Sequence, residues 1–448
     1  MNFRKAAYFG LLRLRGQALG SSYERILQED REGIPPDTTR RALVSLLSHC
    51  KQNVPYYSRL MQAAGDSYRE DPEDYLRHLP VLTKSIIRNQ SEDLKSADLA
   101  RRHCYISFTS GSTGEPVRII QDWCYADRAG AITLLFSRLA GREIGELELS
   151  LWGSSRDIIE GSENWRVRLI NRLTRTRMLD AFRMTPQSMR EFIKILNSEC
   201  PKLVLAYAEA IYELARFAER EGIAVLPQAA VMTSAGTLYP FMRDKIIEVF
   251  QCRVFNRYGS REVGDVACER PGCNGLWVAP WGNYVEIVDG EGNRVPDGTE
   301  GEILVTSLNN YAMPLIRYGL GDRGILAPAG SDAPTVPGQR LQTVLGRTVD
   351  TLRSSDGTLV HGFYFVAILL FRDWVLRVQV VQKGLSHIVF RIVRADSDNH
   401  RQELDEVAAK TQRLMGDDCK VDFEFVDDIP AADSGKFRYT VTEIPPIQ

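Results

Sequence analysis

An α/β fold with more than one domain is predicted by three features of the sequence. The chain has 448 residues, which is longer than an ordinary single domain. Its composition, with 44% hydrophobic and 25% charged residues, is typical of a soluble globular protein with a sizeable core. Between about residues 104 and 320, strand-like runs alternate with amphipathic helical segments. This alternation favours a parallel or mixed sheet covered by helices.

Residues 1–60 are expected to be helical, because the segment 38–53 places apolar residues at helical spacing up to Pro55. The first twenty residues are basic and partly apolar, but they lack the apolar core and cleavage site of a signal peptide. They predict an amphipathic helix, which we expect to pack on the large domain; contact with a membrane surface is the alternative. LPVLTKSIIRNQ (79–90) predicts a connector and a short helix.

The central region then supplies the elements of the sheet. Strand-like runs occur at 105–108, 203–207, 229–235 and 252–259, and helical partners at 186–199, 210–221 and 239–250. Segments 283–308 and 313–327 predict hairpin strands separated by Gly, Asp and Asn turns. The Pro/Gly/Ala-rich stretch 327–339 predicts a loop.

Beyond residue 350 the pattern changes to that of a compact α+β unit of roughly one hundred residues. Strand-like runs at 374–382, 386–394 and 420–426 surround a helical segment at 400–415. One face of that helix is expected to carry Leu404, Val407, Ala408, Thr411 and Leu414. We therefore divide the chain into a helical region 1–100 packed on a large domain 101–349, followed by a small domain 350–448.

Charge and cysteine content restrict the function classes. The net charge is −2, from 56 basic and 58 acidic residues, which gives no support for nucleic-acid binding. Eight scattered cysteines in a chain of this size favour reduced thiols and a cytoplasmic location. No stretch reaches the roughly 18 apolar residues of a transmembrane helix.

The segment FTSGSTGEPVRII (108–120) is the most informative motif. Thr109, Ser110, Ser112 and Thr113 surround the glycines 111 and 114, after the strand-like run CYISF. Consecutive backbone N–H groups and hydroxyls in such a turn can cradle a phosphate chain. The spacing and lysine of a Walker P-loop are absent. From the pattern alone, a phosphate cradle and a Ser/Thr-rich hairpin turn both remain open.

This loop resembles the signature loop of the adenylate-forming superfamily, whose members activate carboxylic acids with ATP. Further family motifs follow in the expected order: SAGTLY (234–239), NRYGSREVGD (256–265), PLIRYGLGDRG (314–324), LGRTVD (345–350) and DSGKFRYTV (433–441). The resemblance is greatest to the phenylacetate–CoA ligase family, especially its CapK-type branch of capsular polysaccharide biosynthesis. The segments that carry this narrower resemblance are NVPYYSRL (53–60), LPVLTKSIIRNQ, NNYAMPLIRYGLGD (309–322) and SSDGTLVHGFYF (354–365).

The resemblance implies an adenylating large domain, a small mobile C-terminal domain and a set of nucleotide contacts. The ATP phosphates would be bound by the loop residues Thr109, Ser110, Gly111, Ser112, Thr113 and Gly114. The adenine face would lie against Ala235 and Gly236, and the nucleotide or acyl pocket would include Asn256, Tyr258 and Gly259. Asp322 would contact the ribose hydroxyls, and Arg347 would contact ribose or phosphate. A carboxylate suits a vicinal diol because it has two acceptor oxygens. A core tyrosine and a plain Gly-Asp turn are the non-functional alternatives for Tyr258 and Asp322.

Three further residues have roles in the reaction that the resemblance implies. Lys436 would neutralise charge at the α-phosphate, Glu262 would help to place Mg²⁺, and Asp350 would be the hinge of the small domain. Without the resemblance, Lys436 and Glu262 would be ordinary surface charges.

A zinc site is not expected, although some members of this branch bind zinc near the corresponding position. Cys252, Cys268 and Cys273 lie within 22 residues, but Trp277 occupies a position where a histidine ligand would be expected. A structural zinc site uses four Cys or His ligands.

The sequence therefore predicts an ATP- and Mg²⁺-dependent, AMP-forming enzyme that converts a small carboxylic acid into an acyl-adenylate. The default acyl acceptor is a thiol such as coenzyme A; a sugar or a carrier protein in polysaccharide biosynthesis is the alternative. Trp and Tyr in 151–155 and 206–212 favour an aryl or other flat acid. Two other functions remain open. The protein could be a non-catalytic nucleotide-binding relative, or an enzyme that transfers the γ-phosphoryl group of ATP. The resemblance leaves the oligomeric state open between monomer and homodimer, since members of the branch are often dimers.

Overall fold

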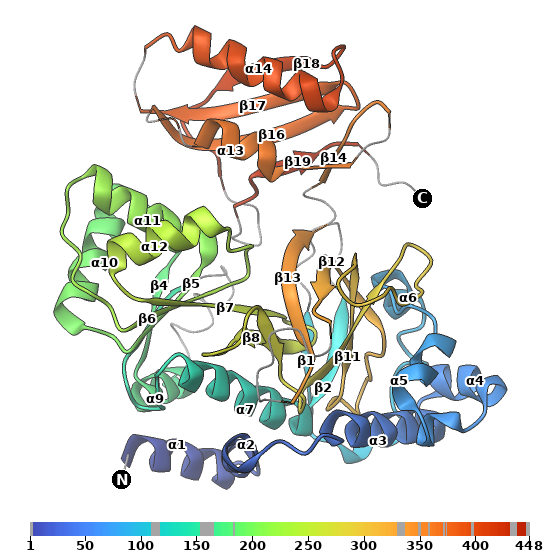
Figure 1. The fold of residues 1–448 in the computed structure, drawn as a ribbon. Coiled ribbons are helices and arrows are strands. Elements are labelled where there is room, and N and C mark those ends of the chain that lie inside the picture. Colours follow the sequence, from blue (N-terminus) through green and yellow to red (C-terminus); the bar gives the residue numbers. More distant parts are fainter. Residues whose placement is uncertain are drawn as a thin grey trace. The chain divides into compact units, whose positions relative to one another are not determined.

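The computed structural model describes residues 3–108, 117–152, 165–181, 184–328, 337–347, 351–356, 359–370, 372, 374–395, 398–430 and 437–444. The chain forms two compact units, Met1–Leu345 and Gly346–Gln448. The first unit has a large mixed sheet covered by helices, and the second has a separate small sheet (Figure 1). This confirms the predicted α/β fold class.

The first unit begins with the helices α1 (Phe3–Leu14), α2 (Leu19–Glu32), α3 (Thr38–Asn53) and α4 (Pro55–Ala64). Short turns of helix follow: η1 (Ser67–Arg69), α5 (Pro72–Tyr75), η2 (Leu76–His78), α6 (Lys84–Asn89) and η3 (Leu99–Arg101). The predicted helices within residues 3–60, and the short helix within 79–90, are thereby confirmed. Pro55 is the first residue of α4, where its missing N–H costs no hydrogen bond.

Eleven strands form the main sheet, in the order β10-β11-β12-β13-β9-β8-β7-β6-β5-β3-β4. A parallel half consists of β3 (Glu148–Trp152), β4 (Thr176–Asp180), β5 (Leu203–Tyr207), β6 (Ala230–Ser234) and β7 (Arg253–Ser260). The other half consists of β8 (Gly264–Glu269), β9 (Leu276–Val278), β10 (Asn283–Val288), β11 (Glu300–Ser307), β12 (Tyr318–Leu326) and β13 (Arg340–Arg347). Pairing changes from parallel to antiparallel between β7 and β8.

Helices cover both faces of the parallel half, as the alternation of side chains along each strand requires. On β5, Val204 packs with α10 (Pro186–Glu199), α11 (Ala208–Arg220) and α12 (Pro240–Phe250). Its neighbour Leu203 belongs to the opposite cluster, with α2 and α7 (Trp123–Leu139). Figure 1 shows α10, α11 and α12 as a group at the parallel strands, with α7 on the other side. The continuous apolar runs of β5 and β6 follow from burial on two faces.

A two-stranded hairpin stands apart from the main sheet. β1 (Cys104–Phe108) pairs antiparallel with β2 (Arg118–Asp122), and Phe108 is opposite Arg118. Asp122 ends β2 and caps α7, because its carboxylate Oδ1 accepts a hydrogen bond from the Tyr125 N–H at 2.9 Å. The sequence predicted the strand but not its exclusion from the main sheet.

The second unit contains a four-stranded sheet in the order β18-β17-β16-β19 and a two-stranded ribbon, β14-β15. Its elements are β14 (Thr351–Arg353), β15 (Leu359–His361), α13 (Phe363–Leu370), β16 (Val375–Gly384), β17 (His387–Arg394), α14 (Arg401–Met415), β18 (Lys420–Phe425) and β19 (Thr440–Thr442). One expectation for α14 is wrong. Leu414 is exposed, and Met415 is buried with Val407 and Thr411. At 100° per residue, Met415 lies nearer the centre of that helix face than Leu414 does.

Candidate active site

The carboxyl ends of the parallel strands form one edge of the first unit, which is where open α/β sheets bind ligands. β3 ends at Trp152, β5 at Tyr207 and β6 just before Ala235. The rings of Trp152 and Tyr207 lie 4.3 Å apart between centroids, in a tilted arrangement. These two predicted pocket residues are therefore together at the edge, whereas residues 153–155 lie outside the described part.

The loop after β6 has a constrained backbone. Ala235 has φ of 65°, a left-handed conformation that L-residues other than glycine seldom adopt. A Cβ on Gly236 would lie 2.1 Å from the Glu209 Oε1 atom, so the glycine leaves space for this carboxylate. Glu209 is in the first turn of α11, where the helix dipole favours a negative charge. The two predicted adenine-side residues thus face an acidic side chain from the neighbouring strand–helix turn.

Strand β7 carries three of the predicted nucleotide residues, Asn256, Tyr258 and Gly259. Asn256 is held by its N–H, which donates to Glu269 Oε2 at 2.9 Å, and by the Thr233 hydroxyl, which donates to its Oδ1 at 3.3 Å. The strand register shifts between Tyr258 and Gly259. A Cβ on Gly259 would lie 2.5 Å from the Gly264 carbonyl oxygen. Only glycine fits there, because the obstacle is backbone and not a movable side chain.

Asp322 and Tyr258 are joined by a direct hydrogen bond. The Tyr258 hydroxyl donates to Asp322 Oδ2 at 2.9 Å. Both side chains are half-buried, and Gly321, with φ of +78°, lies in β12 where its register with β11 shifts, just before Asp322. The structure therefore brings together two predicted site residues from different motifs.

Glu262 contacts β12, the strand that also carries Asp322. Its Oε1 accepts a long hydrogen bond, 3.5 Å, from the Tyr318 hydroxyl on β12. Its backbone carbonyl accepts one from Gln121 Nε2 at 3.0 Å, and Gln121 also reaches the Arg261 carbonyl at 3.2 Å. Gln121 is on β2, the strand that follows the hydroxyl-rich loop. Half-buried carboxylate oxygen is a ligand that Mg²⁺ accepts, so Glu262 fits the implied ion.

The electrostatics of the site are acidic around Asp322. Burial raises the pKa of Glu302, the Arg323 guanidinium opposes this shift, and the charge of Asp322 reinforces it. Asp322 on β12 and Glu302 on β11 therefore form an acidic pair, and Arg323 with its partner Glu300 lies on the same two strands. An acidic pair of this kind suits donor groups such as hydroxyls.

Three of the segments that carry the narrower resemblance, 53–60, 79–90 and 309–322, pack on one another around the start of β12. The Tyr57 hydroxyl donates to the Pro314 carbonyl at 3.1 Å and accepts from the Ile316 N–H at 3.2 Å. Leu82 pairs with Tyr318 through an isolated bridge, with its N–H bonded to the Arg317 carbonyl at 3.0 Å. These contacts explain why motifs so distant in sequence occur together: they support the strand that presents Tyr318 and Asp322.

Several predicted residues lie outside the described part of the chain. They are Thr109, Ser110, Gly111, Ser112, Thr113, Gly114, Asp350 and Lys436. Arg347 is described only as the last backbone position of β13. The hairpin ends Phe108 and Arg118 are described, and β2 reaches the Glu262 turn through Gln121. The roles of these residues stay predictions.

The three cysteines weighed as zinc ligands have the properties of ordinary thiols. Burial raises the pKa of Cys252 to about 12 and also raises the pKa values of Cys268 and Cys273. Trp277 is buried, and its Nε1–H donates to the Pro337 carbonyl at 3.0 Å. Across the residues that the structure describes, no group of three or more metal-binding side chains is present.

Sequence reasoning did not single out Gln121, Tyr318 or Glu302. Tyr318 lies inside a family motif, PLIRYGLGDRG, four residues before Asp322, so its position in the sequence could have suggested a role. Gln121 and Glu302 have no local signal, because their contacts depend on pairing between distant segments.

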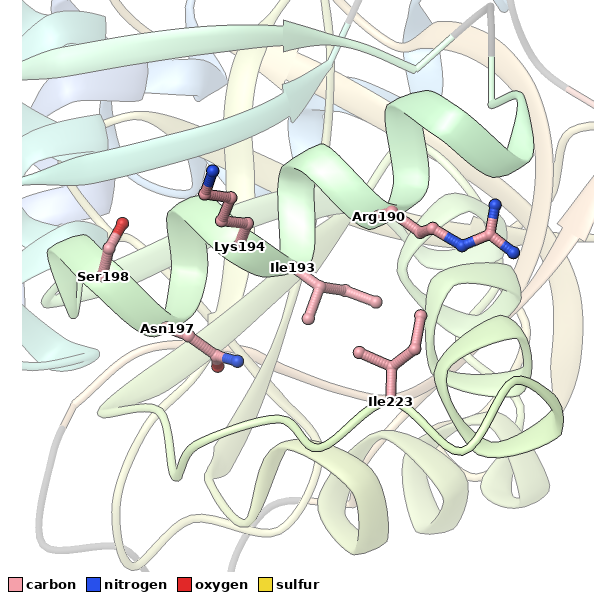
Figure 2. Close-up of a pocket in the computed structure, with 6 residues that line it drawn as sticks. All are labelled: Arg190, Ile193, Lys194, Asn197, Ser198 and Ile223. Atoms are coloured by element: carbon pink, nitrogen blue, oxygen red, sulfur yellow. The ribbon is translucent and has the colours of Figure 1, made fainter.

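A surface hollow of about 430 Å³ lies away from these residues (Figure 2). It is lined by Arg190, Ile193, Lys194, Asn197, Ser198 and Ile223, from α10 and the loop after α11. Arg190 is paired with Glu221, and Asn197 Nδ2 donates to the Ala224 carbonyl at 2.9 Å. None of the predicted site residues lines this hollow, which is a seam where α10 packs on that loop.

Comparison with known proteins places these observations in context. Residues 352–443 match the family model of the CapK C-terminal domain. The chain is 24% identical to protein CapK of Staphylococcus aureus over 406 residues, covering 89% of this chain and 87% of that protein. It is 41% identical to a phenylacetate–coenzyme A ligase of Aromatoleum evansii over 71 residues, 15% of each chain.

Solved structures of a 2-hydroxyisobutyryl-CoA ligase have a similar fold. One, in a postadenylation state with an acyl-AMP, has a TM-score of 0.69 at 18% identity and covers 90% of this chain and 89% of its own. Another, with 2-HIB-AMP and CoA in the thioesterification state, has a TM-score of 0.56 at 19% identity and covers 92% and 91%. The resemblance predicted from the sequence, to the CapK-type branch and to the fold of adenylate-forming ligases, is confirmed.

Proposed function

We propose that this chain, similar to CapK along most of its length, is an ATP-dependent, AMP-forming ligase that activates a carboxylic acid. In the first half-reaction, a substrate carboxylate oxygen attacks the α-phosphorus of ATP. The bond to the β-phosphate bridging oxygen breaks, and pyrophosphate leaves with the electron pair. In the second half-reaction, a thiol such as that of coenzyme A attacks the acyl carbon of the acyl-adenylate and releases AMP.

The Tyr258–Asp322 hydrogen bond is the observation that supports this proposal most directly. It joins the aromatic–Gly and Gly–Asp motifs, which come from different parts of the chain, at one place. Asp322 would accept hydrogen bonds from the ribose hydroxyls, with Tyr258 fixing the carboxylate orientation. Ala235, Gly236, Asn256 and Gly259 occupy the neighbouring ends of β6 and β7, where the adenine would lie.

The reaction needs charge stabilisation at the phosphates. Bound Mg²⁺ would screen phosphate oxygens and polarise the α-phosphorus. Glu262 would hold that ion, the hydroxyl-rich loop 109–114 would donate to the departing pyrophosphate, and Lys436 would donate to the α-phosphate. Arg347 would contact the ribose or a phosphate, and Asp350 would be the hinge that lets the small domain turn between half-reactions.

The acid is proposed to be flat and apolar, such as an aryl acid. Trp152 and Tyr207 form an aromatic pair at the carboxyl ends of β3 and β5. Aromatic walls of this kind bind flat rings by stacking. A cytoplasmic location is proposed, because ATP and coenzyme A are intracellular substrates. A sugar or carrier-protein acceptor in polysaccharide synthesis is the second candidate, favoured by the match of residues 352–443 to the CapK C-terminal domain.

A panel of carboxylic acids tests the proposal, with pyrophosphate release and nucleotide products measured together. We expect AMP, pyrophosphate and an acyl-adenylate detectable by mass spectrometry with at least one acid. Lys436→Ala is expected to lower the rate of adenylation by about 10²–10³-fold, because one aimed donor at the α-phosphate is lost. Chelation of Mg²⁺ is expected to stop the reaction.

Lys410→Ala provides the matched control, because Lys410 is a lysine of the same unit that pairs with Glu406 on α14. It should retain wild-type rates. ADP as the product would show a phosphotransferase instead. Equally low pyrophosphate release by the wild type and Lys436→Ala, with ATP still bound, would show a non-catalytic nucleotide-binding protein.

A further inference from the structure

The three most exposed large apolar side chains in the described part of the chain lie on two helices that touch each other. They are Leu14 (88% exposed) and Phe3 (79%) on α1, and Trp165 (67%) on α9 (Trp165–Thr174). Leu169 of α9 is exposed as well. The Arg4 Nη1 atom donates to the Arg172 carbonyl at 2.7 Å and so ties α1 to α9. Figure 1 shows the two helices at the same end of the first unit.

On each of the two helices, the exposed apolar residues lie along one face. On α9, Trp165, Arg168, Leu169 and Arg172 follow the spacing of one helical face, and all four are exposed. On α1, the exposed residues Phe3, Gly10 and Leu14 follow a similar stripe. α1 is anchored on its other side by buried Leu12 and by Lys5, which pairs with Glu24 at 2.9 Å. These contacts hold α1 against α2 and α9 of the same unit, and they leave an apolar face outside.

The charged side chains that α1 and α9 expose are all basic. Arg4, Arg13, Arg15, Arg168 and Arg172 are exposed around the apolar side chains. No acidic residue occurs in the sequence from 1 to 23 or from 164 to 179, although the whole chain has a net charge of −2. We define the exposed side chains of Phe3, Arg4, Arg13, Leu14, Arg15, Trp165, Arg168, Leu169 and Arg172 as the α1–α9 face.

We propose that the α1–α9 face docks on an anionic lipid bilayer surface. Tryptophan and leucine would enter the interfacial region, and the guanidinium groups would pair with lipid phosphates. Basic residues near an anionic surface each contribute favourably, and the absence of acidic side chains removes repulsion. A second copy of this chain fits worse, because two faces with the same positive charge repel each other. None of the helices in the described part is long and apolar enough to cross the bilayer, so docking would be peripheral.

The proposal does not depend on the catalytic activity and is tested by vesicle flotation of the full chain. The probes are phosphatidylcholine vesicles and vesicles of phosphatidylcholine and phosphatidylglycerol in equal parts. We expect binding to the anionic vesicles only, weakening as NaCl rises because salt screens the charges. Arg168→Gln and Arg172→Gln are each expected to lower the partition coefficient roughly fivefold. Trp165→Ala should also lower it, since an interfacial anchor is lost.

The control variants are Lys202→Gln and Leu226→Ala, an exposed cation and an exposed apolar residue elsewhere on the same unit. They should bind like the wild type, and thermal unfolding should show that every variant is folded. Equal binding to neutral vesicles, no binding to either vesicle, or unchanged binding of the Arg168 and Arg172 variants would overturn the proposal. A dimer in light scattering that Arg168→Gln dissociates would also overturn it, because the face would then be a self-association interface.

Discussion

The Tyr258 hydroxyl joins two motifs that are 64 positions apart in the sequence. A hydroxyl that donates to a carboxylate is a charge-assisted hydrogen bond, stronger than one between neutral groups. It fixes one oxygen of Asp322 and leaves the remaining lone pairs for a ligand. The orientation of this carboxylate is therefore set by a residue that the motif reading assigned only to stacking or to the acyl pocket.

Tyr258→Phe is expected to weaken ATP binding about tenfold while changing the maximal rate of adenylation less. The phenyl ring keeps its packing, but Asp322 loses the donor that orients it, and hydrogen bonds to charged groups contribute about 1.5–3 kcal/mol. Isothermal titration with ATP and the KM for ATP in pyrophosphate release measure the effect. Tyr56→Phe, on helix α4, is the control and should bind ATP normally. An unchanged ATP affinity in Tyr258→Phe would separate this hydrogen bond from nucleotide binding.

Glycine positions show how far single residues can be interpreted from sequence. Gly236 and Gly259 both belong to family motifs, and a Cβ at either position would clash in the structure. The reasons differ, because Gly236 faces the mobile end of Glu209, whereas Gly259 faces backbone. The neighbours that make these glycines necessary come from other strands, and local sequence does not identify them.

At the scale of elements, the junction between β2 and α7 is held by a network of charges. Asp98 accepts from Arg102 at 2.8 and 2.7 Å and from the Ser96 hydroxyl at 2.5 Å. Arg102 Nη1 also donates to the buried carboxylate of Asp122 at 3.2 Å. Asp122 in turn accepts from the Tyr311 N–H at 3.2 Å. The network connects η3, the hairpin β1–β2 and the loop before β12.

Asp98→Asn is expected to destabilise the protein by about 1–2 kcal/mol near neutral pH. The hydrogen bond from Arg102 is the main cause that holds the pKa of Asp98 well below its ordinary value of 3.8. A depressed folded-state pKa means that this stabilisation is present above pH 3.8 and is lost as pH falls further. Urea denaturation at several pH values should therefore show a gap between wild type and variant that narrows in acid.

Asp74→Asn is the matched control for that experiment, because Asp74 pairs with Arg77 on the surface. Exposed pairs contribute little, so no gap is expected at any pH. A gap for Asp98→Asn that stays constant from neutral to acid would show that the aspartate acts by packing and not by charge.

Element positions were largely predictable where periodicity is strong. The expected strand 203–207 is β5, and the expected helix 186–199 is α10, which has Thr185 as its capping residue and Pro186 at its first position. Periodicity could not predict that β1 and β2 form their own sheet, nor that Met415 replaces Leu414 in the core. These outcomes depend on which distant surface each element meets.

At the scale of the whole molecule, the two units have separate hydrophobic cores. Phe390 of β17 is fully buried and stacks on Phe423 of β18 at 5.4 Å between ring centroids, within the second unit. Phe250 of α12 is fully buried within the first unit. Each core is formed by residues of its own unit, which is the condition for independent unfolding.

Phe390→Ala is expected to cost about 3–5 kcal/mol in the second unit alone, because a buried ring leaves a cavity. Hydrogen exchange followed by mass spectrometry should show lost protection in β16, β17 and β18, with β5, β6 and β7 unchanged. Phe250→Ala should give the reverse pattern. Loss of protection in both units after either substitution would mean that the chain unfolds as one cooperative body.

The overall architecture followed from the alternation of strands and helices, and a second compact unit begins at Gly346. The division of the first unit into 1–100 and 101–349 remains a prediction. The placement of Thr109–Gly114, Lys436 and Asp350 also remains a prediction, because these residues lie outside the described part of the chain. Composition and the order of the motifs were enough to predict the class of protein. The contacts that join β2, the β7–β8 turn and β12 could be found only in the three-dimensional structure.

Pairing in the main sheet changes from parallel to antiparallel at β7. The aromatic pair and the strand of Asp322 therefore belong to different halves of the sheet. Trp152 and Tyr207, at the ends of β3 and β5, lie in the parallel half, whereas Asp322 lies on β12, a strand held by Tyr57 and Leu82. Under the proposed chemistry, substitutions around Trp152 and Tyr207 would change the selectivity for the acid and leave the affinity for the nucleotide unchanged.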